Sequence, residues 1–155
     1  MPEQEDAIRS LLLPLEDDNL LLPGTVVAEV VGYVPPEPAG DGAPDWLLGS
    51  IDWRGQRVPC VAFESLDGQS LPEGAGARAR LVVLKAVGED PTLPYIAVRT
   101  RSIPRLINVE REGLEIRDEE APPQGIQQAV LAHGEPALIP DLAAVEGWIR
   151  GALHH

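Results

Sequence analysis

Few residues of this chain have the chemistry of a catalytic or metal-binding group. Histidine occurs at His133 and at the C-terminal pair His154 and His155, which has the form of a purification-tag remnant, and Cys60 is the only cysteine. Zinc sites need several Cys or His ligands, and a nucleophilic triad needs a base close to its nucleophile. Neither pattern occurs, nor does a Gly-rich nucleotide motif. The sequence therefore predicts a protein that is not an enzyme, with no metal and no cofactor.

The charge balance and the lone cysteine restrict the partners and the compartment. The formal net charge is −13, from 25 acidic and 12 basic residues, whereas a nucleic-acid partner would need a basic face. The acidic runs at 16–18 and 118–120 are expected to be solvated loops, with steering of a basic partner as the alternative. Cys60 allows no internal disulfide, which suits the cytoplasm. No stretch reaches the roughly 18 apolar residues of a membrane span.

The elements that would position any site are short strands. With 16 prolines and 15 glycines, turns are frequent and long helices are scarce, which favours an all-β fold. A Pro/Gly-rich loop is expected at 35–45 and another loop at 64–77. A closing helix is predicted over 140–153, with Asp141 as its N-cap. Outside the hairpin described next, strands are predicted at 8–15, 20–22, 79–87 and 95–100, with 81–84 expected to be buried on both faces. A further short element is expected at 103–109 and a closing hairpin at 129–139, and a family resemblance given below implies a strand near 29–33.

The clearest local pattern is a hairpin over residues 46–63, with its two-residue turn at Arg54-Gly55. Pro59 donates no hydrogen bond to a neighbouring strand, so we expect an edge strand or a bulge near the end of that hairpin. A faint repeat places Gly55 over Gly134. It also aligns three further pairs downstream, which are Val58 with Ala137, Cys60 with Ile139, and Phe63 with Leu142. Such an echo is what two similar small barrels in one chain would give.

This hairpin carries a resemblance to CheW-like domains, the adaptors of bacterial chemosensory arrays. The shared spacing is Gly-x-x-x-x-Arg-Gly-x-x-x-Pro with apolar flanks, and the likeness continues along nearly the whole chain. The matching positions are Trp46, Leu47, Leu48, Gly49, Ile51, Trp53, Arg54, Gly55, Val58, Pro59 and Val61. The short, acidic character is similar to the ChpC-like branch, which is linked to type IV pilus chemosensory systems.

The resemblance implies a fold of two five-stranded SH3-like barrel lobes packed together, with a C-terminal helix. In this interpretation residues 1–155 form a single CheW-like domain. Its lobes span about 15–77 and 78–140, and residues 1–14 and 141–155 pack across them. The implied function is that of a cytoplasmic adaptor, recruited to receptor arrays without membrane insertion. It would couple methyl-accepting receptors to the regulatory domain of a CheA-type histidine kinase, in chemotaxis or twitching motility.

The same resemblance suggests where a receptor would bind. It implies receptor-binding positions at Val27, Glu29, Gly49, Arg54 and Val58. Arg54 would pair with a receptor carboxylate, and the alternative is an internal salt bridge or a cap on the turn. Trp53 stands where the family has a smaller aliphatic residue, and it would be an interface anchor if exposed or plain core if buried. Asp52 and Ala62 also depart from the family pattern.

Two other functions remain open from the sequence. The chain would be a β-barrel small-ligand binder or enzyme if a deep inter-lobe pocket held convergent polar groups. It would be a self-associating structural protein if open barrel edges joined copies of the chain.

Overall fold

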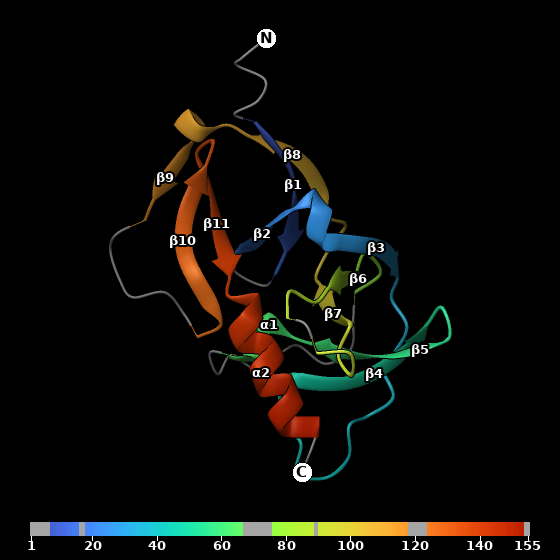
Figure 1. Cartoon of the computed structure of the whole chain (residues 1–155). Coiled ribbons are helices and arrows are strands. Elements are labelled where there is room, and N and C mark those ends of the chain that lie inside the picture. The colour runs from blue at the N-terminus through green and yellow to red at the C-terminus, as the bar shows by residue number, and fades with distance from the viewer. Residues whose placement is uncertain (1–6, 16–17, 67–75, 89, 118–123, 154–155) are drawn as a thin grey trace.

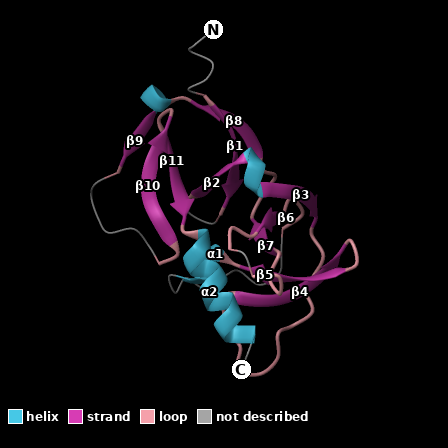
Figure 2. Cartoon of the chain, viewed as in Figure 1, coloured by secondary structure: helices cyan, strands magenta, loops and turns pink. Residues whose placement is uncertain are grey.

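A computed structural model gives the structure of residues 7–15, 18–66, 76–88, 90–117 and 124–153. His154, His155 and most of both acidic runs lie outside these described residues. Strands dominate the fold, and helices are few and short (Figure 2). No helix in the described ranges combines the length and apolarity that a membrane crossing requires.

The strands form two sheets, which we call the terminal sheet and the central sheet. The terminal sheet has the order β8-β1-β2-β11-β10-β9, and the central sheet has the order β3-β6-β7-β5-β4. The terminal sheet contains β1 (Ile8–Pro14), β2 (Asn19–Pro23), β8 (Arg105–Val109), β9 (Leu114–Ile116), β10 (Ile126–Ala132) and β11 (Glu135–Pro140). The central sheet contains β3 (Val27–Gly32), β4 (Leu47–Trp53), β5 (Gln56–Val61), β6 (Arg80–Lys85) and β7 (Tyr95–Thr100).

The helical elements lie at the ends of strands. Two single 3-10 turns, η2 (Gly24–Val26) and η3 (Arg111–Gly113), precede β3 and β9. The short helix α1 (Phe63–Leu66) follows β5, and α2 (Leu142–Leu153) follows β11. The Asp141 carboxylate accepts a hydrogen bond from the Ala144 amide at 3.1 Å, which confirms the predicted N-cap. Figure 1 shows the terminal sheet at the top, the central sheet below it, and α2 running down toward β4.

Apolar side chains pack in three layers. Each sheet has its own cluster of buried apolar side chains on one face. A third and larger cluster, which we call the inter-sheet core, lies between the two sheets and includes residues of both helices. On β6, Leu81 and Val83 enter the central-sheet core, whereas Val82 and Leu84 enter the inter-sheet core, as predicted for a strand buried on both faces. Burying such side chains contributes about 1.5–3 kcal/mol each.

The all-β fold with two lobes and a C-terminal helix is confirmed, but the predicted lobe boundaries are wrong. The central sheet uses the continuous stretch 27–100, so it crosses the expected boundary at residue 78. The terminal sheet takes strands from both ends of the chain and has six strands rather than five. The reason is long-range pairing: β1 pairs with β8, and β2 runs parallel to β11. The structure also adds α1 and the three-residue β9, for which no element was predicted.

The faint repeat in the sequence corresponds to a structural repeat. Each turn pair, Arg54-Gly55 and His133-Gly134, has positive φ at both residues, and a strand and then a helix follow. Val58 and Ala137 each lie in the core of their own sheet, and Phe63 and Leu142 each begin a helix and enter the inter-sheet core. The same unit is therefore built twice, once in each lobe.

The expectation of an edge strand at Pro59 is wrong. Pro59 lies in β5, between β4 and β7, and β4 is the edge. Ser50, opposite Pro59, exchanges its backbone hydrogen bonds with Glu37 instead, at 2.8 and 2.9 Å. The pairing of β5 with β7 begins at Cys60, so the missing N–H lies just before that ladder. The alternative expectation, a bulge near the end of the hairpin, agrees with the structure, which has a bulge in β4 between Leu47 and Gly49, opposite Val61 and Cys60.

Candidate functional site

The turn at the tip of the β4–β5 hairpin positions the first candidate residues. Arg54 has a φ of 51° and Gly55 a φ of 77°. Positive φ at both central residues is typical of the tight turn whose twist matches a hairpin. For a side-chain-bearing residue this conformation costs about 1–2 kcal/mol, so contacts of Arg54 must offset it.

Those contacts join three of the predicted residues, Glu29, Trp53 and Arg54, which we call the Glu29 cluster. The Trp53 indole Nε1 donates a hydrogen bond to Glu29 Oε1 at 2.9 Å, and Arg54 Nη2 lies 3.2 Å from the same oxygen. The Arg54 guanidinium carbon also lies 4.9 Å from the centroid of the Trp53 ring, within range of a cation–π contact. The residues come from β3, β4 and the turn after it, so the fold brings together side chains that are 24 and 25 positions apart in the sequence.

The Glu29 cluster closes the central sheet. Its strands β3 and β4 are the two edges of that sheet. The side chains of Glu29 and Trp53 connect these edges, and the Trp53 ring packs edge-to-face on Tyr95 with centroids 4.8 Å apart. The cluster is therefore structural as well as exposed.

Burial decides between the alternatives left open by the sequence. Trp53 is only 8% exposed, so it is core and the interface-anchor alternative is wrong. Arg54 does make the internal ion pair, yet 67% of its side chain remains accessible, and Glu29 retains 40%. Both charged groups can therefore be reached by a partner while they pair with each other.

The other predicted site residues do not join this cluster, although Val58 packs in the same core as Trp53. Val58 is fully buried in the central-sheet core, and Val27 is half-buried against the inter-sheet core. Gly49 has a φ of 141°, and a Cβ there would lie 2.0 Å from the Glu37 carbonyl oxygen. Of the predicted site residues, only Arg54 and Glu29 combine a charged group with an accessible side chain.

The terminal lobe has a similar contact between its hairpin turn and an edge strand, and this contact was not predicted as a site. His133 occupies the turn position equivalent to Arg54, with a φ of 50°. Its Nε2 lies 3.1 Å from the Asn108 carbonyl oxygen on β8 and 3.3 Å from the Glu110 backbone nitrogen. Gly113 packs so closely on the imidazole that any Cβ there would overlap it. The repeat in the sequence was the available signal for this contact.

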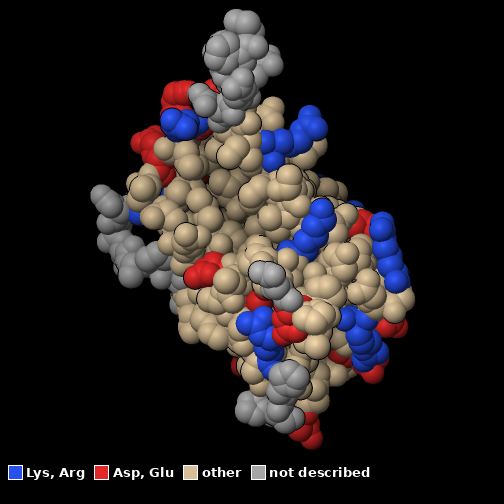
Figure 3. All heavy atoms as spheres, in the orientation of Figure 1, with Lys and Arg blue, Asp and Glu red and all other residues tan. Residues whose placement is uncertain are grey.

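Apolar side chains are exposed on the two edge strands of the terminal sheet. Leu106 on β8 is 73% exposed, and Leu114 and Ile116 on β9 are also exposed. Charged side chains of both signs are interspersed on the face shown in Figure 3, so neither sign forms a continuous field there. The terminal lobe thus offers apolar edges, whereas the central lobe offers the charged Glu29 cluster.

Cys60 is a core residue rather than a nucleophile. Burial, partly opposed by the positive charge of Arg99, raises the pKa of its thiol to about 12. Thiol reagents react with the thiolate, so we expect Cys60 to resist labelling in the folded protein at pH 8 and to react after unfolding in denaturant. A folded-state pKa above the ordinary value of about 8.5 also means that Cys60 contributes less to stability as the pH rises beyond that value. Rapid labelling without denaturant would contradict this burial.

Within the described ranges, no three His, Cys, Asp or Glu side chains come together as a metal site requires. The arrangement of the Glu29 cluster suits recognition of a charged partner, because it combines an accessible guanidinium with an accessible carboxylate on a rigid closure.

Comparison with known proteins agrees with this fold. The CheW-like domain matches residues 9–147. No curated protein sequence matches the chain. Among solved structures, the chain is similar to the scaffolding protein TtCheW from Thermoanaerobacter tengcongensis, with 15% identity, a TM-score of 0.72, and coverage of 88% of this chain and 90% of that one. That likeness supports the fold. The chain belongs to the CheW-like domain family of non-enzymatic chemotaxis scaffolds.

Proposed function

We propose that this protein is an adaptor that couples methyl-accepting receptors to a CheA-type histidine kinase through two separate faces. The observation that carries the proposal is the Glu29 cluster, where Arg54 stays 67% accessible although it is held by an ion pair. A scaffold needs partner-binding groups in fixed positions, and this cluster supplies them on a closed barrel.

The receptor would bind at the Glu29 cluster. A guanidinium has five N–H donors in a planar fork, and Glu29 engages Nη2, so other donors can pair with a carboxylate of the receptor tip. The stacking of Arg54 on Trp53 limits its motion and lowers the entropy cost of that pairing. By resemblance, Val27, Gly49 and Val58 belong to the same receptor-binding region, and Val58 would support the cluster through the core that it shares with Trp53.

The kinase regulatory domain would bind the terminal lobe. Exposed Leu106 and Ile116 lie on the edge strands β8 and β9, in the other sheet from the receptor-binding cluster. Exposed apolar groups and unpaired strand edges are features of protein interfaces. Two faces on two lobes would let one adaptor hold both partners at once.

Kinase control would then follow from population shift. The adaptor contacts the kinase differently in the two receptor states, and the difference in contact free energy biases the kinase conformation. The protein would act in the cytoplasm at receptor arrays. The resemblance to the ChpC-like branch extends the proposal to twitching motility through type IV pili.

The test is a comparison of receptor capture from the native lysate by wild type and three variants. Arg54→Glu should reduce receptor recovery about ten-fold, equivalent to ~1.4 kcal/mol, because it places a carboxylate against Glu29 and against the receptor. Arg57→Glu is the matched control, since Arg57 is on the same hairpin, is similarly exposed and pairs with Glu37. Receptor recovery by the Arg57→Glu variant should stay within about two-fold of the wild-type recovery.

A charge-swap variant separates fold from interface. Glu29→Arg combined with Arg54→Glu keeps an internal ion pair but reverses the charges offered to a receptor. We expect its unfolding midpoint to return toward wild type while receptor capture stays low. Full capture by this double variant would show that the pair is only structural, and failure of the folded wild type to recover either receptor or kinase would overturn the proposed function.

A further inference from the structure

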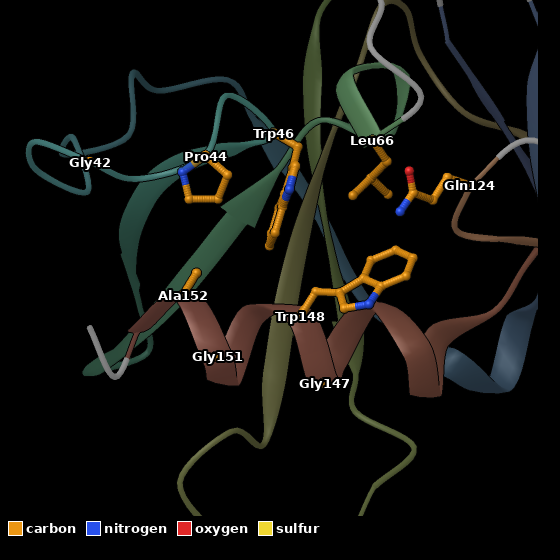
Figure 4. Close-up of a pocket in the computed structure, with 9 residues that line it drawn as sticks. All are labelled: Gly42, Pro44, Trp46, Leu66, Gln124, Gly147, Trp148, Gly151 and Ala152. Atoms are coloured by element: carbon orange, nitrogen blue, oxygen red, sulfur yellow. The ribbon is translucent and has the colours of Figure 1, made fainter.

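A pocket of about 580 Å³ opens beside α2, away from the residues used above. It lies between Trp148 on α2, Trp46 before β4, and Leu66 at the end of α1, as Figure 4 shows. Pockets of a few hundred to about 1,000 Å³ are the size that holds small organic molecules. This pocket therefore has the capacity of a ligand site.

The chemistry of the lining favours an apolar ring. Trp46 and Trp148 are half-buried, and both pack against the inter-sheet core. Pro44 and Leu66 add further apolar surface, and Gln124 supplies a side-chain amide. None of the described residues that line the pocket is titratable, so the lining itself offers no counter-charge to an ionic group.

Charged residues beside the lining residues favour one sign of ligand charge. Asp41 and Asp45 are exposed and are adjacent in sequence to Gly42, Pro44 and Trp46, which line the pocket. The Arg150 guanidinium comes within 3.8 Å of the position of a Cβ on Gly147, but it also lies 3.7 Å from Asp90, whose carboxylate offsets its positive charge. An indole face also attracts a cation through its ring quadrupole. A positively charged ligand is thus favoured over an anion.

We propose that this pocket binds small aromatic amines, with the ring between Trp46 and Trp148 and the ammonium group at the Asp41–Asp45 rim. This is a ligand site distinct from the receptor and kinase faces. It does not depend on the proposed adaptor function, since it uses none of the same residues.

The test uses three probes that share one ring: 2-phenylethylamine, benzyl alcohol and phenylacetate. The chain has three tryptophans, so nitrogen-15 NMR gives an internal control. The indole signals of Trp46 and Trp148 should shift saturably with the amine, while that of Trp53, buried in the central-sheet core, should not. Affinity should fall from amine to alcohol to acid, with at least a several-fold gap between the first and last at low salt.

Two variants make the test independent of unfolding. A Cβ at Gly147 would meet only the Arg150 guanidinium, at 3.8 Å, so Gly147→Leu fills the pocket without a backbone clash. Leucine also favours the helix more than glycine does, so the unfolding midpoint should equal or exceed that of wild type while amine binding is lost. Asp41→Asn with Asp45→Asn should bring the amine affinity down to that of the alcohol.

Several results would overturn the proposal. These are no saturable shift with millimolar amine, equal binding of phenylacetate, equal shifts of all three indoles, or unchanged amine binding by a folded Gly147→Leu variant. Shifts of Trp46 and Trp148 that follow protein concentration without any probe would also overturn it, because they would identify a second copy of the chain as the occupant.

Discussion

Replacing Gly49 by alanine is expected to lower the free energy of unfolding by about 3 kcal/mol. The φ of 141° is unfavourable for any side chain, which accounts for roughly 1–2 kcal/mol. The new Cβ would also lie 2.0 Å from the Glu37 carbonyl oxygen, which is backbone and has little freedom to move. Relief of that clash must separate residue 37 from β4 and break the two hydrogen bonds between Glu37 and Ser50, at about 1 kcal/mol each.

Substitutions at two other glycines separate the cost of the positive φ from the cost of the clash with residue 37. A Cβ at Gly55 would meet nothing within 4 Å, but its φ is 77°, so Gly55→Ala should show only the conformational cost. Gly32 in β3 has open space and no positive φ, so Gly32→Ala should be close to neutral. Urea denaturation of the three variants should rank them Gly49, Gly55, Gly32. Similar losses at Gly49 and Gly55 would mean that the contact with residue 37 contributes nothing.

The ranking also matters for the proposed receptor site. Gly49 was placed there by resemblance, yet the structure gives it a role in holding the loop before β4. If Gly49→Ala loses receptor capture, its folded fraction must be measured before the loss is assigned to the interface.

The second large effect is expected at Glu146. This carboxylate lies on α2, is 1% exposed, and accepts hydrogen bonds from the backbone amides of Val87 and Gly88 at 2.7 and 2.9 Å. It therefore fixes the turn after β6 onto the helix. Glu146→Ala removes the shared acceptor of these two hydrogen bonds, at about 1 kcal/mol each, so we expect a loss of about 2 kcal/mol. Glu146→Gln keeps one acceptor oxygen and should lose about half as much.

The control for Glu146 is a substitution in the same region of α2 that does not affect the hydrogen bonds to Val87 and Gly88. Asp141→Ala removes the N-cap bond to Ala144 and should cost about 1 kcal/mol. Thermal and urea unfolding of the three variants would check the order. A loss for Glu146→Ala no larger than for Asp141→Ala would show that the carboxylate does not hold the turn.

Local patterns predicted the elements well where they are self-contained. The hairpin around Arg54-Gly55, the doubly buried strand near Leu81 and the N-cap at Asp141 each depend on a few neighbouring residues. The sequence also contained a signal for Glu146 that was not used. The buried face of α2 has Leu142, Val145 and Ile149, and Glu146 lies on the same stripe, where a charged residue must find partners.

The pairing between distant segments could not be read from such patterns. Nothing local to β1 indicates that Leu11 will pair with Leu106, so the lobe boundaries were placed by order along the chain. The contacts of Glu29 had the same limitation. The residues of the cluster were named from a family resemblance, but that Trp53 is buried and bonded to Glu29 follows from barrel closure.

The way the two sheets share the chain imposes an order on biosynthesis. The central sheet is encoded by one unbroken stretch, so all its strands have been made once residue 100 has left the ribosome. The terminal sheet waits for β11, since β2 has a partner there whose residues are made more than a hundred positions later. Until then β2 lacks one of its neighbours, although β1 can pair with β8 once residue 109 has been made. The leucine-rich hairpin of β1 and β2 is therefore made first and has its second edge covered last, so it is open to incorrect strand pairing for longer than the strands of the central sheet.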